Sequence, residues 1–268
     1  ELAKMMVGRE TFGVRLQDAC INVEPVYELT GITLEGKLEK KVLDDVSFCV
    51  GKGEILGIAG VSGNGQGELT EVLTGLVPPS KGTIKLEGKD ITHLTPGEIS
   101  EAGVGRTPQD RHQGTIGDLT VAENLALEHI KDYTNRGLLD RKKIREDAAA
   151  IISEFQIKAS PGDQLRKLSG GNMQKVVLAR ALSRKPRVLI ASQPTRGLDV
   201  GATEYVRNRL LEERTRGTAV ILLSEDLDEV LALSDRIAVI YEGRIMGVVP
   251  SAEATPEKIG LLMAGAVQ

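Results

Sequence analysis

The sequence predicts an α/β fold with a mainly parallel sheet covered by helices on both faces, and three observations lead to it. Apolar runs over 54–59, 187–192, 218–224 and 236–241 are typical of buried strands. Stretches of helical periodicity separate the last three runs. With 268 residues, the chain can bury a substantial core in one large domain or two smaller ones. Ligands of such sheets bind beyond the carboxyl ends of the strands.

The segments before the first apolar run are expected to be mostly extended. Residues 22–50 read as extended pieces broken at Gly31 and Gly36, with a strand over 42–50. The run over 54–59 leads into a loop of four glycines and then into a predicted helix over 68–76. This order is strand, glycine loop, helix.

The middle of the chain is expected to be helical. A hairpin over 82–92 and a short strand over 103–109 come before it. Residues 120–123 form a capping box, and a second helix is marked by one apolar face: Ile144, Ala148, Ile151, Ile152 and Phe155. We therefore predict a helical insertion over residues 113 to about 183, and a further helix over 202–211.

Composition excludes several classes of function. The net charge of −4 and the pI near 5.6 argue against a nucleic-acid partner, and aromatic residues make up only 3% of the chain. Cys20 and Cys49 lack metal-ligand spacing, and the chain has three histidines, so we expect no metal site. No apolar run approaches the roughly 18 residues of a membrane-spanning helix.

The first residues of the chain are similar in sequence to the last ones. Residues 2–8 (LAKMMVG) resemble residues 259–265 (IGLLMAG), which a short apolar helix ending in Gly also explains. The chain does not begin with Met and has no leader-like segment. We expect residues 1–21 to be the tail of a preceding domain with its linker, and residues 22–268 to be the main domain.

The segment LSGGNMQ at residues 168–174 has the composition of an anion site. Its glycines let backbone N–H groups approach an anion, the serine adds a donor, and the following helix directs the positive end of its dipole there. An ordinary helix start with a Ser cap is the alternative. The residues concerned are Ser169, Gly170, Gly171 and Asn172.

The loop GVSGNGQG at residues 60–67 matches the phosphate-binding pattern G-x-x-x-x-G-K-[ST] except at its last two positions. Gln66 replaces the lysine, so the loop can donate a hydrogen bond but cannot neutralise phosphate charge. Gly67 has no hydroxyl for a magnesium ion. A structural glycine turn is the alternative. The candidate phosphate-binding residues are Gly60, Ser62, Gly63, Asn64, Gly65, Gln66 and Gly67.

The order of these motifs resembles the nucleotide-binding domains of ABC transporters. Between the glycine loop and the end of the chain lie PQDR at 108–111, LSGGN at 168–172, PTRGLD at 194–199 and LSED at 223–226. More narrowly, the chain resembles the second ATPase domain of fused two-domain ATPases that drive importers of simple sugars or nucleosides. The resemblance implies a P-loop NTPase-like, mainly parallel sheet with an N-terminal antiparallel β subdomain and an inserted α-helical subdomain.

Four positions depart from the family's pattern together. Ser192 and Gln193 stand where the family has the Asp-Glu pair that binds magnesium and polarises the attacking water, and neither can act as a base. Glu225 replaces the switch histidine, and Gln66 replaces the lysine. The resemblance therefore implies negligible ATP turnover at this domain's own site.

Other positions match the pattern. In the family, two domains pair head to tail, so Ser169, Gly170, Gly171 and Asn172 would complete the ATP site of a partner domain, where Mg²⁺ is also expected. Asp199 would lie at the interface, and a cap for the following helix is the alternative. Gln109 matches the glutamine that links the nucleotide to the membrane subunit, and a solvated loop residue is its alternative. The adenine-stacking aromatic has no clear counterpart, Tyr27 being the nearest.

The resemblance also implies partners and a location. We expect an upstream nucleotide-binding domain in the same full-length chain, transmembrane permease subunits, and a peripheral position at the cytoplasmic face of the membrane. Two alternatives remain open at this point. The domain could hydrolyse ATP by itself, with Gln193 orienting water, or it could be a regulatory or interaction module outside any transporter.

Overall fold

The computed structural model describes residues 24–36, 41–135 and 137–266. The predicted tail and linker over residues 1–21 therefore lie outside the described residues. A six-stranded sheet has the order β12-β11-β3-β10-β9-β6, and all pairings in it are parallel except that of β12 with β11. Its strands are β3 (Ile55–Ala59), β6 (Val104–Thr107), β9 (Val188–Ser192), β10 (Ala219–Ser224), β11 (Arg236–Tyr241) and β12 (Arg244–Pro250).

A second, antiparallel sheet is formed mainly by the N-terminal residues. Its strands are β1 (Pro25–Glu35), β2 (Lys41–Gly51), β4 (Lys81–Leu86) and β5 (Lys89–Asp90). The predicted break at Gly31 is wrong, because β1 continues through this residue, which has a φ of 64° and lies at a shift of register between Leu29 and Ile32.

Helix α3 (Gln66–Leu73) lies between the two sheets. Its residues Leu69, Val72 and Leu73 belong to one apolar cluster with buried side chains of both sheets. The helix starts two residues before the predicted position, directly after Gly65, whose left-handed φ of 103° ends the glycine loop. The beginning of α3 is therefore held by the main core.

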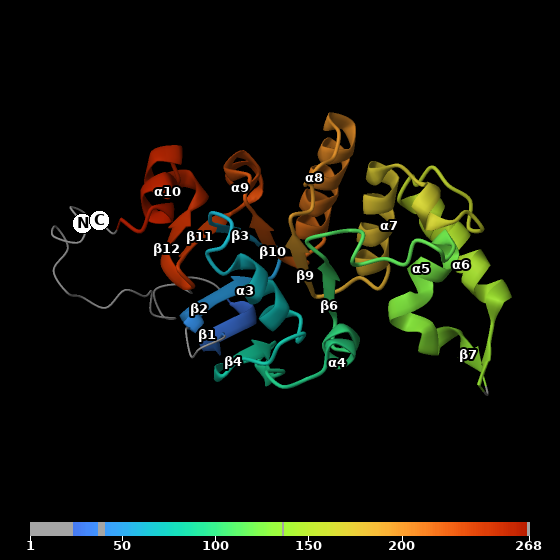
Figure 1. Cartoon of the computed structure of the whole chain (residues 1–268), viewed down its shortest axis with the longest axis horizontal. Coiled ribbons are helices and arrows are strands. Elements are labelled where there is room, and N and C mark those ends of the chain that lie inside the picture. The colour runs from blue at the N-terminus through green and yellow to red at the C-terminus, as the bar shows by residue number, and fades with distance from the viewer. Residues whose placement is uncertain (1–23, 37–40, 136, 267–268) are drawn as a thin grey trace.

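The region between β6 and β9 is mainly helical and lies at one end of the molecule (Figure 1). A second apolar cluster joins this region to the other face of the central sheet. The predicted capping box is present: the Glu123 N–H donates to Thr120 Oγ1 at 3.2 Å, and the Thr120 N–H donates to Glu123 Oε2 at 2.9 Å. Its elements are α5 (Val121–Ala126), η2 (Leu127–Tyr133), β7 (Thr134–Asn135), β8 (Leu138–Leu139), α6 (Arg141–Glu154), η3 (Leu165–Lys167) and α7 (Gly170–Leu182).

The remaining helices are α4 (Pro96–Glu101), α8 (Val200–Thr215), α9 (Leu227–Leu233), η4 (Ser251–Glu253) and α10 (Pro256–Met263). Side chains of α9 and α10 pack with β11 and β12 in a third apolar cluster. The predicted fold class is confirmed. In the described part of the chain, no helix combines the length and the apolar character that a membrane span requires.

Candidate functional site

The motif residues gather at the carboxyl edge of the central sheet. Because β3, β10, β9 and β6 are adjacent and parallel, the loops that follow them emerge on the same side. These loops contain the glycine loop after β3, the switch position after β10, residues 193–199 after β9, and Gln109 after β6. The sheet thus brings together residues that are up to about 160 positions apart, for example Gln66 and Ser224.

The glycine loop has a backbone suited to an anion. Gly63 and Gly65 have φ values of 86° and 103°, and Gly65 precedes the first helical residue without a side-chain cap. A Cβ on Gly60 would lie 2.8 Å from the carbonyl oxygen of Ile240, so this position admits no side chain without a shift. Ser62 is exposed at the tip of the loop, and Asn64 ties the loop to the β11–β12 turn by accepting from the Glu242 N–H at 3.1 Å.

The side chain of Gln66 binds the protein itself. Its Nε2 donates to the carbonyl oxygen of Ile58 at 2.9 Å and, at 3.4 Å, to that of Ser224, and the residue is only 7% exposed. Its Oε1 is buried without a hydrogen-bond partner among the described residues. The sequence-based expectation that this amide remains free to donate to phosphate therefore does not match the geometry, in which both donors face backbone carbonyls.

Two uncharged residues, Ser192 and Gln193, stand where ATP hydrolysis would need a metal ligand and a general base. Ser192 is buried at the end of β9, and its Oγ lies 3.5 Å from Thr70 Oγ1. Gln193 has a left-handed φ of 47°, and its Oε1 accepts from the Glu225 N–H at 3.4 Å. The Glu225 side chain is exposed. The backbone cradle therefore fits a phosphate, whereas the neutral donors of Ser192 and Gln193 do not fit a Mg²⁺ ion, which prefers carboxylates.

Residues 109–111, which follow β6, lie close both to the glycine loop and to the start of α7. A Cβ on Gly67 would lie 4.0 Å from Gln109 Oε1, so this glutamine faces the start of α3. Two residues further on, Arg111 donates from Nη1 to the carbonyl oxygen of Arg196 at 2.8 Å. A Cβ on Gly170 would lie 3.3 Å from Arg111 Nη2, which places this guanidinium against the start of α7.

Ser169 is the N-cap of α7, and its neighbours are fixed by hydrogen bonds. Asn172 donates to Ser169 Oγ through its backbone N–H at 3.4 Å and through Nδ2 at 3.0 Å. A Cβ on Gly171 would lie 3.9 Å from Asp199 Oδ2 and 2.9 Å from the Ala202 Cβ. Asp199 caps α8 by accepting from the Ala202 N–H at 2.8 Å. Residues 169–172, which we call the signature segment, thus adjoin the predicted interface residue Asp199 in the same chain.

A buried carboxylate that the sequence motifs did not single out lies at the same edge. Glu229 is 1% exposed and accepts from Thr195 Oγ1 at 2.7 Å and from Ser224 Oγ at 2.8 Å. The Arg207 Nε lies 3.5 Å from Glu229 Oε1. This carboxylate joins the loop after β9 to the end of β10. Its only sequence signal was its place three residues after Asp226, in the first turn of α9.

Tyr27 does not offer a surface for adenine. It is fully buried in the main core, its hydroxyl donates to the carbonyl oxygen of Leu73 at 2.8 Å, and burial raises the pKa of the phenol. Its ring therefore belongs to the contact between β1 and α3.

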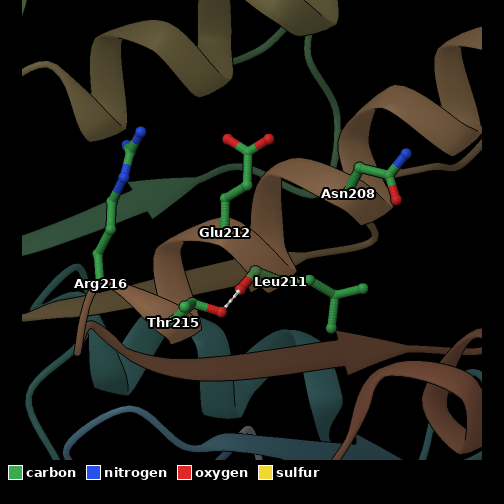
Figure 2. Close-up of a pocket in the computed structure, with 5 residues that line it drawn as sticks. All are labelled: Asn208, Leu211, Glu212, Thr215 and Arg216. Atoms are coloured by element: carbon green, nitrogen blue, oxygen red, sulfur yellow. Dashed lines mark hydrogen bonds between the residues drawn. The ribbon is translucent and has the colours of Figure 1, made fainter.

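Two hollows on the surface differ in their relation to this edge. An open pocket of about 440 Å³ is lined by residues 109–113 with Arg196 and Gly197, which places it beside the predicted sites. Another, of about 510 Å³, lies along α8, where the Thr215 hydroxyl donates to the carbonyl oxygen of Leu211 (Figure 2). Because α8 begins at the carboxyl edge, its last turn lies toward the amino ends of the strands, and this second hollow is unrelated to the motifs.

The chain is similar to ATP-binding proteins of importers. A family model described as "ABC transporter" matches residues 43–196. The chain is 46% identical over its whole length to the guanosine import ATP-binding protein NupO of Bacillus subtilis, and 42% identical over 99% of its length to the nucleoside import ATP-binding protein NupA of Lactococcus lactis. The glucose import ATP-binding protein TsgD13 of Haloferax volcanii is also 42% identical over 99% of the chain. The chain spans about half the length of these relatives, 53%, 53% and 49%.

Solved structures agree with the fold. A nucleotide-free ATP-binding cassette from an ABC transporter has a TM-score of 0.75 at 28% identity, covering 89% of this chain and 95% of that one. The ADP conformation of another ATP-binding cassette has a TM-score of 0.74 at 27% identity, covering 90% of this chain and 96% of that one.

Proposed function

The chain belongs to the ABC transporter family, and from this premise we propose that it is an ATP-binding domain of an importer for nucleosides or simple sugars. Two relatives that match it over 99–100% of its length are named for guanosine or nucleoside import, and a third is named for glucose import. The domain would comprise residues 22–268 and contain a helical subdomain over about 113–183. Its partners would be transmembrane permease subunits, and it would be peripheral at the cytoplasmic face of the membrane.

We further propose that this domain pairs with a catalytic ATP-binding domain and completes the partner's site. The observation that carries this proposal is a contrast within one chain. The signature segment is fixed by hydrogen bonds, whereas the chain's own nucleotide site has uncharged residues at the positions for the phosphate-binding cation, the metal ligand and the base. Ser169 is exposed at the N-cap of α7, and the half-buried Gly170 and Gly171 follow it beside Asp199. By contrast, Gln66, Ser192 and Gln193 supply neither a cation nor a carboxylate. The relatives' extra length leaves room for an upstream domain of this kind.

ATP would be the ligand at both sites, with Mg²⁺ at the partner's site. In this domain's own site the loop at 60–67 and Gln109 would contact the phosphates through neutral donors. Without a general base, turnover there would fall by roughly two to four orders of magnitude. The own site would bind nucleotide without contributing to hydrolysis.

The experiment measures ATP hydrolysis and transport by the assembled importer that contains the full-length chain. Ser169→Arg is expected to lower hydrolysis roughly 100-fold or more, because a bulky cation replaces a phosphate donor. Gln193→Ala should leave the rate unchanged. Ser153→Arg, on the exposed face of α6, is the matched control and should behave like the unsubstituted chain.

Three results would contradict the proposal. Loss of hydrolysis in Gln193→Ala would show that this domain's own site is the active one. Unchanged hydrolysis in Ser169→Arg would show that α7 does not complete a partner's site, and failure of the full-length chain to assemble with a permease would favour a module outside transport.

A further inference from the structure

The hydroxyl of Ser169 receives two hydrogen bonds from one residue. The Asn172 backbone N–H and Nδ2 both donate to Ser169 Oγ, at 3.4 and 3.0 Å. The direction of the amide is fixed from its other side, because the Lys158 backbone N–H, which can only donate, lies 2.8 Å from Asn172 Oδ1. The oxygen of this amide must therefore face Lys158, and the nitrogen must face Ser169.

With these two donors in place, the Ser169 hydroxyl can form one further hydrogen bond, in which it is the donor. A hydroxyl has two acceptor lone pairs and one proton. Both lone pairs of Ser169 Oγ are engaged by donors, so the proton must point to an acceptor elsewhere. Within the described ranges the Ser169 hydroxyl donates to no protein acceptor, and the residue is exposed at the start of α7, where the helix dipole favours an anion.

We infer that Asn172 is a positioning residue that holds the Ser169 hydroxyl as an outward donor to a phosphate oxygen. The inference rests on the proposed function, in which that phosphate is the terminal one of the nucleotide bound by the partner domain. The amide is chemically required here, because a carboxylate at the same position could only accept. The hydroxyl proton would then turn inward, and the donor to the phosphate would be lost.

The test uses the full-length chain in the assembled importer and compares Ser169→Ala, Asn172→Ala and the double variant. Each single substitution should lower kcat for ATP hydrolysis roughly 10- to 100-fold, the range for one hydrogen bond to a charged group. The double variant should be no slower than Ser169→Ala, because Asn172 acts through the serine. Thermal unfolding of each variant shows whether it is folded.

The pH profile of Asn172→Asp separates positioning from packing. The substitution keeps the shape of the side chain, so it carries the test even where Asn172→Ala unfolds. At neutral pH its kcat should be as low as that of Ser169→Ala. Relative to the unsubstituted chain, it should recover as the pH falls and the introduced carboxyl gains a proton that it can donate. Asn172→Ala should show no such recovery, and equal profiles for both variants would overturn the inference.

The outcomes also separate this inference from the proposed function. If Ser169→Ala leaves hydrolysis unchanged, the composite site itself is wrong. If Ser169→Ala is slow and Asn172→Ala adds a further independent loss, the composite site stands and the positioning role of Asn172 is wrong.

Discussion

Gln66 directs its side-chain amide to backbone carbonyls of β3 and β10. The position lies at the end of a loop whose backbone still suits a phosphate, so the missing element is charge. Since the donors of Gln66 are bonded to Ile58 and Ser224, a bound phosphate would depend on the backbone N–H groups of the loop. The glycine loop therefore offers a phosphate hydrogen-bond donors but no positive charge.

We expect Gln66→Lys to tighten ATP binding by about tenfold without creating turnover. A hydrogen bond to a charged group contributes roughly 1.5–3 kcal/mol, but Ser192 and Gln193 would still provide neither metal ligand nor base. Calorimetric titration of ATP, with and without Mg²⁺, measures the affinity. Asn208→Lys, on the exposed side of α8, adds the same charge away from the loop and should not change the dissociation constant.

A strong dependence of the Gln66→Lys affinity on Mg²⁺ would contradict this description of the site. It would mean that a metal ion is bound in spite of the neutral groups at Ser192 and Gln193.

Helix α5, like α4, starts with a capping box that is closed on both sides. We expect Thr120→Ala to lower the free energy of unfolding by about 1 kcal/mol, the usual cost of losing an N-cap side chain. Urea unfolding followed by circular dichroism measures this change. Thr215→Ala, which removes an exposed hydroxyl from the last turn of α8, should change it by less than about 0.5 kcal/mol.

The same element predicts a dependence on pH. Hydrogen bonds from the backbone and side chain of Thr120 hold the pKa of Glu123 below its usual range. A carboxyl with a lowered folded pKa stabilises the protein above its unfolded pKa, and this contribution is lost as the pH falls through the folded pKa. Thr120→Ala should therefore lose less stability on acidification below about pH 4.3 than the unsubstituted chain. Equal losses would contradict this assignment.

Elements of the core could be predicted from the sequence because burial on both faces produces continuous apolar runs. The predicted strands over 187–192 and 218–224 agree with β9 and β10 to within one residue. The error at Gly31 arose because a shift of register allows a strand to continue through a glycine, which no local pattern reveals. The contacts of Arg111 with the loop after β9 and with α7 depend on pairing between distant segments, and the sequence alone could not predict them.

At the scale of the molecule, α3 links the two sheets through the main apolar cluster. Leu73 is fully buried in the apolar cluster that contains β1, β2, β3 and β10, and its carbonyl oxygen accepts from Tyr27. We expect Leu73→Ala to lower the free energy of unfolding by about 2–5 kcal/mol through the cavity that it leaves. Both sheets should be affected, and denaturant unfolding monitored by circular dichroism measures the change.

Leu138→Ala is the matched control, because this leucine is 77% exposed at the β7–β8 hairpin. Its substitution should change the free energy of unfolding by less than about 0.5 kcal/mol. Similar losses for the two leucines would show that α3 is not the common core of the two sheets.

The carboxylate of Glu229 has a consequence for motion. It is bonded to Thr195 in the loop after β9 and to Ser224 at the end of β10, and it is almost completely shielded from water. Opening either segment would remove a hydrogen bond from a buried carboxylate, which is costly. In amide hydrogen exchange the two segments should therefore open as one cooperative unit, and this edge of the molecule would reach a partner as a single rigid body.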